Sequence, residues 1–342
     1  MSTEKREKTV NCLSIFYTNA RSLIKKRDEL AAYAMSENPD IISITETWVN
    51  TSDKHLISEV SIPGYNSFLS CRENRKGDGV ILFIKDTIDA TEIEKVNRPA
   101  YESVYVKIKI NKKHIILATI YRPPKTTLEN DNLLYEEIET ILKTKTAIIC
   151  GDFNLPYINW SLFASDNEGL QLLKLVKKLY LSQFVNEPTL ENNVLDIILA
   201  TDPDLISICE VGETLSNSDH KIVRCKINCE VTVKENKILV PNYKRANISG
   251  LKTDLQKINW RAVLLSHNVE QMCVIFTNTL LEAESKWIPK VKKRIDGTKK
   301  PQWMTNDIQL IINRKRRTYK NYKRSKSNVD FLRYTAAKRL TL

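Results

Sequence analysis

A short apolar run, Ala147 to Cys150, ends in Gly151-Asp152-Phe153-Asn154. Such a run, stopped by a glycine, is typical of a buried strand followed by a tight turn. The turn places a carboxylate and a carboxamide at the carboxyl end of a strand, where open α/β sheets bind ligands. Asp152 is suited to accept a proton or bind a cation, and Asn154 to orient an anionic group. Taken alone, this sequence is more often only a surface turn, because Gly, Asn and Asp are turn formers.

Polar side chains recur at the ends of other predicted strands. Hydrophobic patterning predicts strands at 11–18, 41–45, 64–70, 79–84, 105–110, 114–121, 194–199, 205–211 and 221–227. The polar residues at or beside strand exits are Asn19, Glu46, Tyr121, Asp152, Asn154, Asp196, Asp219 and His220. Each has an ordinary explanation by itself, as a turn former, a cap or a packing aromatic. Together they indicate a site, because those explanations do not predict a polar group at one strand exit after another.

The chemistry that suits this set is hydrolysis of a phosphate ester. Glu46 with Asn19 offers oxygen ligands to a hard divalent cation, for which Mg²⁺ is the natural choice and Mn²⁺ an alternative. Asp152 can activate a water, while His220 bonds a phosphoryl oxygen and Asp196 fixes its tautomer. The sequence leaves open whether Asp152 or His220 is the general base.

The elements that position these residues predict the fold class. Helical patterns at about 23–36, 128–142 and 168–181 alternate with the strands. Because strands recur at both short and helix-length spacings, we expect an α/β body with mixed sheets rather than a simple parallel one.

Charge is distributed unevenly along the 342 residues, whose net charge is +12. From Lys286 onward there are 18 Lys and Arg against three acids, whereas the first 285 residues carry 35 basic and 38 acidic residues. The basic character therefore belongs to the C-terminal region. From about Asn306 it predicts a basic helix, which is either a solvated face or a surface for a nucleic-acid backbone.

The remaining composition indicates an intracellular chain. The seven cysteines are odd in number and include no Cys-x-x-Cys pair, which favours reduced thiols over a zinc site or a disulfide scaffold. The polar start lacks the apolar segment of a signal peptide, and no apolar run approaches the roughly 18–20 residues that span a bilayer. We expect no membrane partner.

The order of the motifs resembles the endonuclease/exonuclease/phosphatase superfamily, and more narrowly the apurinic/apyrimidinic-like endonuclease of non-LTR retrotransposons of the jockey and chicken-repeat type. The resemblance covers about residues 11–229. Its motifs are Asn19 to Leu23, Pro39 to Trp48, Gly77 to Val80, Tyr121 to Pro124, Gly151 to Asn154, Leu195 to Leu199 and Ser218 to His220. It implies a DNase I-like, four-layer α/β sandwich, in which two mixed sheets pack face to face between helices, with a basic helical extension at the C-terminus.

The resemblance also implies a role for each site residue. Glu46, Asn19 and Asp219 would form the metal site, and Asp152 would activate the water. His220, paired with Asp196, and Asn154 would contact the phosphate, and Tyr121 marks the abasic-endonuclease-like branch. We assign DNA contacts to Thr189, Arg122, Arg316 and Arg317. Arg21 stands where cellular repair enzymes carry an aspartate, which favours a one-metal site. The hairpin from Leu190 to Val194 is short, which argues against strong sequence specificity.

These inferences give a domain map and a function. We predict a disordered N-terminus at 1–10, a catalytic domain at 11–230, a linker at 231–245 and a basic, mainly helical connector at 246–342. In retrotransposon polyproteins such a connector precedes a reverse transcriptase, and the chain lacks the Ala-Asp-Asp polymerase signature, so we interpret it as a fragment or truncated copy. The predicted function is a Mg²⁺-dependent endonuclease that nicks target DNA, leaves a 3′-hydroxyl, and acts in the nucleus by family analogy.

Two alternatives remain open at this stage. The first is another phosphoesterase of the superfamily, such as an abasic-site endonuclease, an exonuclease or a phosphatase. The second is an inactive nucleic-acid-binding relic that uses only its basic C-terminal region, which we also expect to be a possible contact for RNA.

Overall fold

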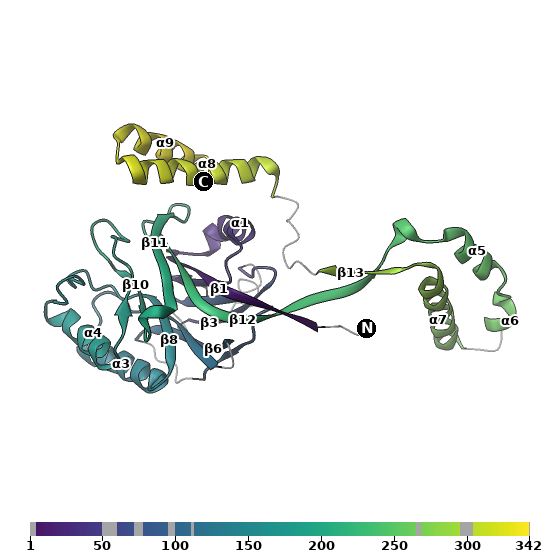
Figure 1. Ribbon diagram of the computed structural model, residues 1–342, viewed down its shortest axis with the longest axis horizontal. Helices are drawn as coiled ribbons and strands as arrows, with labels where there is room; N and C mark the ends of the chain where they lie inside the picture. Colours follow the sequence, from purple (N-terminus) through teal and green to yellow (C-terminus); the bar gives the residue numbers. More distant parts are fainter. Residues whose placement is uncertain are drawn as a thin grey trace. The chain divides into compact units, whose positions relative to one another are not determined.

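The computed structural model describes residues 5–49, 60–71, 78–94, 100–110, 113–264, 268–294 and 304–341. The chain divides into two compact units (Figure 1). One unit consists of Glu7–Val233 together with Gly297–Leu342, and the other of Met1–Arg6 together with Lys234–Asp296. Among the described residues, no helix combines the length and apolarity that crossing a membrane requires.

The first unit is built on two mixed sheets. One sheet has the order β11-β12-β1-β2-β4-β3. In it β1 is parallel to β2, and the pairs β2–β4 and β4–β3 are antiparallel. Its strands are β1 (Lys5–Asn19), β2 (Ile41–Thr45), β3 (Tyr65–Ser70), β4 (Val80–Lys85), β11 (Ile206–Thr214) and β12 (Lys221–Pro241).

The other sheet has the order β5-β6-β7-β8-β10-β9, in which only the β7–β8 pair is parallel. Its strands are β5 (Ala90–Glu92), β6 (Glu102–Ile110), β7 (Lys113–Tyr121), β8 (Thr146–Asp152), β9 (Ser182–Gln183) and β10 (Asp196–Ala200).

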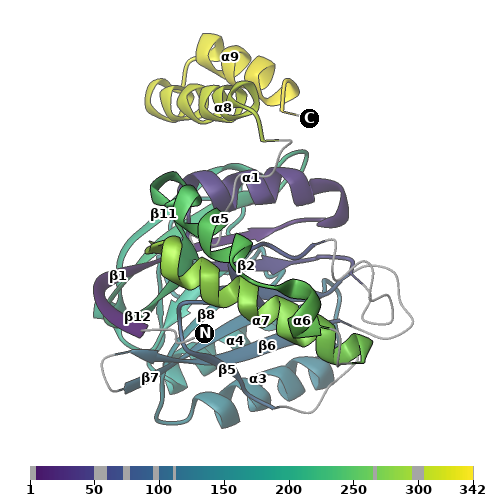
Figure 2. The ribbon, with the colours of Figure 1, turned by 90° about the vertical axis from the view of Figure 1, so that its right-hand side faces the viewer.

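The alternation of side chains along the strands creates the layers. Ile148 and Cys150 on β8 face the apolar core between the sheets, which Leu13 and Ile15 on β1 share. Ala147 and Ile149, the intervening residues, pack instead against the helices α3 (Leu128–Leu142) and α4 (Asn167–Lys178). The outer face of the sheet that contains β1 and β2 packs on α1 (Arg27–Glu37). The predicted four-layer α/β sandwich is therefore confirmed, as Figure 2 also shows.

The register of the strands brings the predicted site residues to one end of each sheet. In the parallel pair β1–β2, Asn19 lies opposite Thr45, directly before Glu46. In the other sheet Asp152 is the register partner of both Tyr121 on β7 and Asp196 on β10. The carboxyl ends of β1, β2, β7 and β8 thus carry the site, as strand ends do in other α/β proteins.

The second unit contains three helices and one strand among its described residues. They are α5 (Ile248–Gln256), α6 (Trp260–Leu264), α7 (Val269–Trp287) and β13 (Lys290–Arg294), which pairs with the distal end of β12. The indole Nε1 of Trp287 donates to Asp254 at 2.8 Å, joining α7 to α5.

The structure differs from the predicted map at both ends of the catalytic domain. Residues 5–10, expected to be disordered, are paired backbone of β1, and the linker expected at 231–245 is mostly the continuation of β12 to Pro241. A polar stretch looks like a linker in sequence, but it forms a strand where backbone partners are available. The expected 246–342 connector is also split, because 297–342 belongs to the same unit as residues 7–233. This unit carries the predicted site and is called here the catalytic unit.

The C-terminal helical hairpin, α8 (Asn306–Ser325) and α9 (Asn328–Arg339), docks on the catalytic unit. Met304 and Ile312 pack against Ala32 of α1. Lys315, only 1% exposed, donates from Nζ to Glu29 Oε1 at 2.5 Å and to the carbonyl oxygen of Thr214 at 3.0 Å. A buried ammonium needs such partners, since an unpaired buried charge is strongly destabilising. The predicted basic helix therefore exists, but part of its charge holds it in place.

Substituting this buried lysine tests the docking. We expect Lys315→Met to destabilise the docked hairpin by about 3 kcal/mol, because Glu29 is left buried without its cation. Amide hydrogen exchange across 306–339, measured by mass spectrometry, should accelerate accordingly. Combining Lys315→Met with Glu29→Met removes both charges and should restore much of the protection. Unchanged exchange in Lys315→Met would contradict this account of the docking.

Candidate active site

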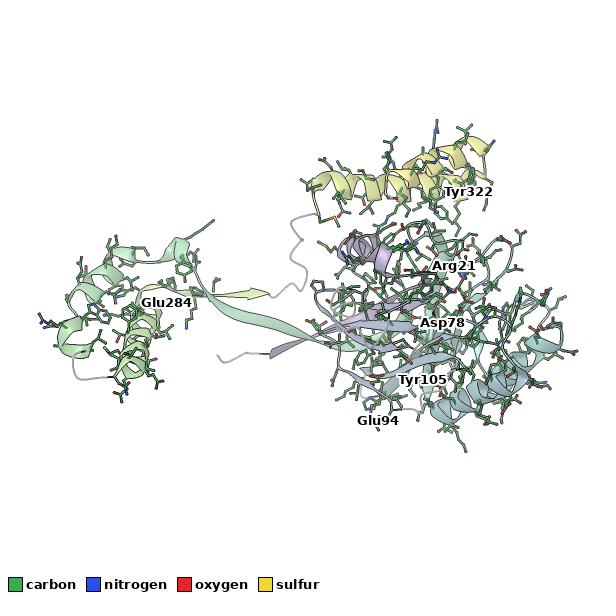
Figure 3. The ribbon with its side chains drawn as sticks, turned by 180° about the vertical axis from the view of Figure 1, so that it is seen from behind. Arg21, Asp78, Glu94, Tyr105, Glu284 and Tyr322 are labelled. Atoms are coloured by element: carbon green, nitrogen blue, oxygen red, sulfur yellow. The ribbon has the colours of Figure 1, made fainter. Side chains whose placement is uncertain are left out.

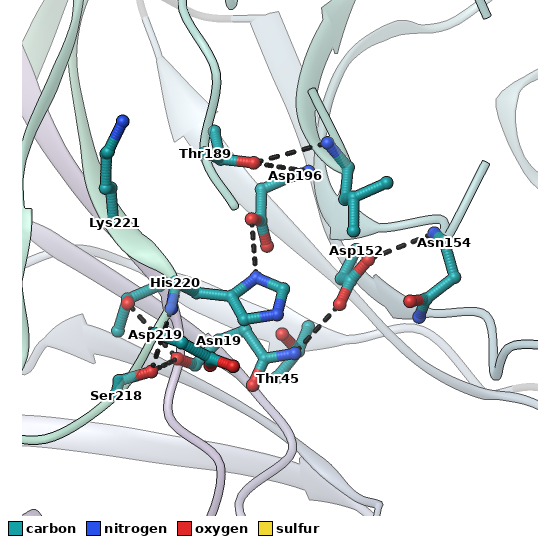
Figure 4. Close-up of polar contacts among 12 residues, drawn as sticks. Asn19, Thr45, Asp152, Asn154, Thr189, Asp196, Ser218, Asp219, His220 and Lys221 are labelled. Carbon is teal, nitrogen blue, oxygen red and sulfur yellow. Dashed lines mark hydrogen bonds and ion pairs between the residues drawn. The ribbon is translucent and has the colours of Figure 1, made fainter. Parts of the chain in front are cut away.

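The centre of the site is a buried trio, Asp152, Asp196 and His220 (Figure 4). His220 Nδ1 lies 2.7 Å from Asp196 Oδ2. The second oxygen of Asp196 accepts from the Tyr17 hydroxyl at 2.7 Å, so both sheets contribute to holding this carboxylate. Asp152 Oδ1 accepts the backbone N–H of Asn154 at 3.0 Å, which closes the turn after β8.

Burial of two neighbouring carboxylates controls the electrostatics. Burial, followed by the charge of Asp196, raises the pKa of Asp152 well above its usual range. Burial alone would lower the pKa of His220, but the charge of Asp196 and its hydrogen bond outweigh it and raise that pKa to about 9. Near neutral pH the pKa of His220 therefore favours its imidazolium form.

Asn19 joins the trio to Glu46. Its Nδ2 donates at 2.8 Å both to Glu46 Oε1 and to Asp152 Oδ2, while its Oδ1 accepts the backbone N–H of Arg21 at 3.0 Å. In this orientation Asn19 holds two carboxylates together with its nitrogen and turns its oxygen away from them. The predicted role of Asn19 as an oxygen ligand is thus not what the geometry shows, because the adjacent carboxylates require a donor.

Glu46 is fixed by backbone and side-chain contacts. It adopts a left-handed φ of 49°, an unusual conformation for glutamate, and its carbonyl oxygen accepts the N–H of Ser22 at 2.9 Å. The Tyr121 hydroxyl hydrogen-bonds to the Glu46 side chain, and its pKa lies well above its usual range because of burial, then of the charges of Glu46 and Asp152. Tyr121 therefore remains a neutral donor that orients this carboxylate.

Two carboxylate positions are candidates for a metal. One ligand atom each from Asp152, Asp196 and His220 lies within 4.8 Å of the others, so this trio could hold an ion. However, Asp196 and His220 already bond to each other, whereas Glu46 and Asp152 converge on one amide nitrogen and Glu46 is only partly buried. An oxygen donor pair of this kind fits a hard divalent cation, and it gives such an ion access to solvent.

The phosphate-binding candidates surround the trio. Asn154 Nδ2 donates to the carbonyl oxygen of Arg122 at 2.9 Å, which holds the amide at the rim of the site. The Thr189 hydroxyl accepts the N–H groups of Leu195 and Asp196 at 3.2 and 3.1 Å, so it positions the start of β10 (Figure 4). The hairpin that follows Thr189 is a tight turn in which Leu190 pairs with Asn193, as short as the sequence predicted.

Two of the predicted contacts are engaged elsewhere. Arg122 is 2% exposed and forms a bidentate ion pair with Asp131 at 2.6 and 2.8 Å, so its assignment to DNA binding is wrong. A buried carboxylate on α3 captures this arginine, which then supports the turn by donating to the carbonyl oxygen of Phe153 at 3.1 Å. Asp219, predicted for the metal, pairs instead with Arg21 at 2.5 Å in a half-exposed contact.

The two arginines of the basic helix that were predicted to contact DNA, Arg316 and Arg317, differ in their surroundings. Arg316 is also largely engaged, since its guanidinium pairs with Glu37 and lies 4.2 Å from the centre of the Tyr33 ring, so it serves docking rather than DNA. Arg317 is exposed.

Some positioning residues were not identified from the sequence. Tyr17 bonds both Asp196 and the Thr45 hydroxyl, at 2.7 and 3.1 Å. Ser218 donates to the carbonyl oxygen of Asn19 at 2.8 Å and accepts the N–H of His220 at 3.3 Å. Tyr17 alternates with the apolar residues of β1 and so looks like core, but a hydroxyl on an inward-facing strand position is a signal that could have identified it.

Comparison with known proteins adds independent support. Residues 115–224 match the family described as endonuclease-reverse transcriptase. The RNA-directed DNA polymerase from mobile element jockey of Drosophila melanogaster is 21% identical over 326 residues, covering 92% of this chain and 34% of that protein. The chain thus spans about a third of the length of this curated relative.

Solved structures agree on the fold. The endonuclease domain of TRAS1, a telomere-specific non-LTR retrotransposon, is 21% identical, with a TM-score of 0.53 over 64% of this chain and 98% of that domain. The AP endonuclease LMAP from Leishmania major is 13% identical, with a TM-score of 0.55 over 64% of this chain and 88% of that one.

The two sheets give the chain the fold of these solved endonuclease structures. The match of residues 115–224 to the endonuclease-reverse transcriptase family agrees with the resemblance drawn from the motifs.

The buried histidine predicts a pH-dependent stability. Because the folded pKa of His220 lies above the 6.5 of a free histidine, its contribution is complete below about pH 6.5 and is lost as pH rises through 9. We expect wild-type unfolding free energy in EDTA to fall by about 3 kcal/mol over this window, measured by urea denaturation. His220→Gln should flatten the decline, whereas His114→Gln, at an exposed histidine, should preserve it. Identical declines in all three proteins would refute the assignment.

Proposed function

We propose that this protein is a Mg²⁺-dependent DNA endonuclease that hydrolyses one phosphodiester and leaves a 3′-hydroxyl. The observation that carries the proposal is the network in which Asn19 holds Glu46 and Asp152 together while Asp196 holds His220. Within one site at the strand ends, it supplies a carboxylate that can bind a cation, a base, and a hydrogen-bond donor for the phosphate.

In this mechanism Glu46 would hold the divalent cation, and Asn19 keeps Asp152 beside it. When bound, such an ion neutralises charge at the phosphate oxygens and polarises phosphorus toward attack. Tyr121 and Asn19 keep the Glu46 carboxylate directed at the ion.

Asp152 and His220 take different parts in the reaction. Because the pKa of His220 is about 9, its imidazolium is a donor near neutral pH and suits a phosphoryl oxygen. Asp152 is then the base, since burial raises its pKa toward the working range, where a carboxylate accepts a proton best. Water attacks phosphorus, Asp152 takes its proton, the bond to O3′ breaks, and the leaving O3′ takes up a proton from solvent, leaving a 3′-hydroxyl and a 5′-phosphate.

DNA is the proposed substrate because the similar TRAS1 domain is an endonuclease of a telomere-specific element and the jockey relative makes DNA. The tight turn at Leu190 to Asn193 presents little surface to a groove, which supports broad rather than strict sequence selection. The 3′-hydroxyl suits a priming role for a polymerase of the jockey kind.

Nicking of supercoiled plasmid by the full chain tests the activity. We expect open-circle product with Mg²⁺ or Mn²⁺ and none in EDTA. Glu46→Gln and His220→Gln should each lower the rate at least 100-fold, since each removes a charge from the site. Glu210→Gln, at an exposed position on β11, is the matched control and should nick normally. A folded wild-type protein that leaves both intact and abasic plasmid supercoiled would reject the endonuclease.

The chemistry of the nick is tested separately. We expect the nicked plasmid to be extended directly by a DNA polymerase that lacks 3′-exonuclease activity, because cleavage on the O3′ side frees a hydroxyl. Incorporation of labelled nucleotide only after phosphatase treatment would show a 3′-phosphate and contradict the proposed bond.

A further inference from the structure

Helix α8, which Figure 3 shows with its side chains, has two sets of basic residues that differ in burial. With 3.6 residues per turn, one face contains Ile312, Lys315, Arg316, Tyr319 and Lys323, which are buried or half-buried. This is the face that docks on the catalytic unit or on α9.

A second set of side chains recurs every three or four residues on another face. These residues, called here the outer basic face, are all exposed and carry a positive charge: Arg314, Arg317, Lys320 and Arg324. Docking does not use them, so their charge is available to a partner.

The charge balance of the catalytic unit indicates what that partner is. Residues 7–233, which carry the site, contain 26 Lys and Arg against 32 Asp and Glu. The hairpin at 304–341 contains 11 against two. A body of net −6 repels a polyanionic substrate, and the hairpin of net +9 reverses the sign of the unit.

The hairpin is attached to the segments that carry the site. Lys323 Nζ donates to Glu187 Oε1 and to the carbonyl oxygen of Val211, both at 2.8 Å. Glu187 precedes Thr189 by two residues, and Thr214, bonded by Lys315, leads into the loop of His220.

One segment joins the hairpin contact to His220. Lys221, which follows His220 directly, donates from Nζ to the carbonyl oxygen of Pro188 at 2.8 Å and from its backbone N–H to the carbonyl oxygen of Thr189 at 2.9 Å. Pro188 follows Glu187, the partner of Lys323 on α8. The hairpin is therefore held by the same segment that is bonded to the residue after His220.

We propose that the outer basic face of α8 binds the phosphate backbone of the same duplex DNA whose scissile phosphate lies at His220. This inference rests on the proposed DNA endonuclease. Ten residues separate Arg314 from Arg324, about 15 Å along a helix, which matches four or five base-pair steps of 3.4 Å. The face contributes affinity and register but no base readout, because Lys and Arg on a backbone carry no sequence information.

The test is a quadruple variant of the full chain, Arg314→Gln, Arg317→Gln, Lys320→Gln and Arg324→Gln. Its matched control is Lys107→Gln, Lys109→Gln, Lys143→Gln and Lys145→Gln, which removes the same charge from exposed positions on β6 and on the segment between α3 and β8. In steady-state nicking of a duplex oligonucleotide, we expect the outer-face variant to raise KM at least tenfold with kcat unchanged. The slope of log KM against log salt should fall by up to about 3.6, or 0.9 per lost phosphate contact.

The control should leave both KM and its salt slope close to wild type, and circular dichroism should show both variants folded. Equal KM values in the two variants would overturn the inference, as would a defect confined to single-stranded RNA binding. If the wild type does not nick DNA, the endonuclease proposal fails by itself. Fluorescence anisotropy with the same duplex then still decides this inference, because binding loss confined to the outer-face variant supports it and equal binding overturns it.

Discussion

The site depends on the burial of two carboxylates, Asp152 and Asp196, on adjacent strands of one sheet. Two like charges that are close together and buried away from water repel each other strongly, so the surrounding structure supplies hydrogen-bond donors to these carboxylates from both sheets. Tyr17 and Asn19 reach across from the other sheet, and His220 completes the set. The packing of the two sheets is therefore also what makes the site possible, because Tyr17 and Asn19 of one sheet bond to Asp196 and Asp152 of the other.

The same constraint explains the rigid turns around the centre. Arg122 forms an ion pair with Asp131, and its backbone and side chain also hold the turn at Asn154 in place. Glu46 is held in a left-handed conformation by the segment that follows Asn19. Strained or buried polar groups of this kind persist only where neighbours determine them, and here they direct oxygen atoms to one position.

Charge is arranged on two scales in this unit. At short range, buried carboxylates raise the affinity of the site for protons or a cation. At longer range, the acidic body is balanced by a basic hairpin that is distant in sequence but belongs to the same compact unit. A nuclease needs both, since the groups that hold a metal are the same groups that repel a polyanion.

The sequence by itself determined the fold class, because hydrophobic patterning located the strands and helices. It also predicted that Asn19, Glu46, Tyr121, Asp152, Asp196 and His220 lie near one another, since strand exits in α/β proteins converge. Only the tertiary structure decided which polar side chains were already in use. In the sequence Arg122 and Arg316 appear available for DNA, yet they form ion pairs with Asp131 and Glu37. Tyr17 resembles a core residue in the sequence, although its hydroxyl bonds to Asp196. The physical reason is that pairing of buried charge is a long-range property, set by partners that lie far away along the chain.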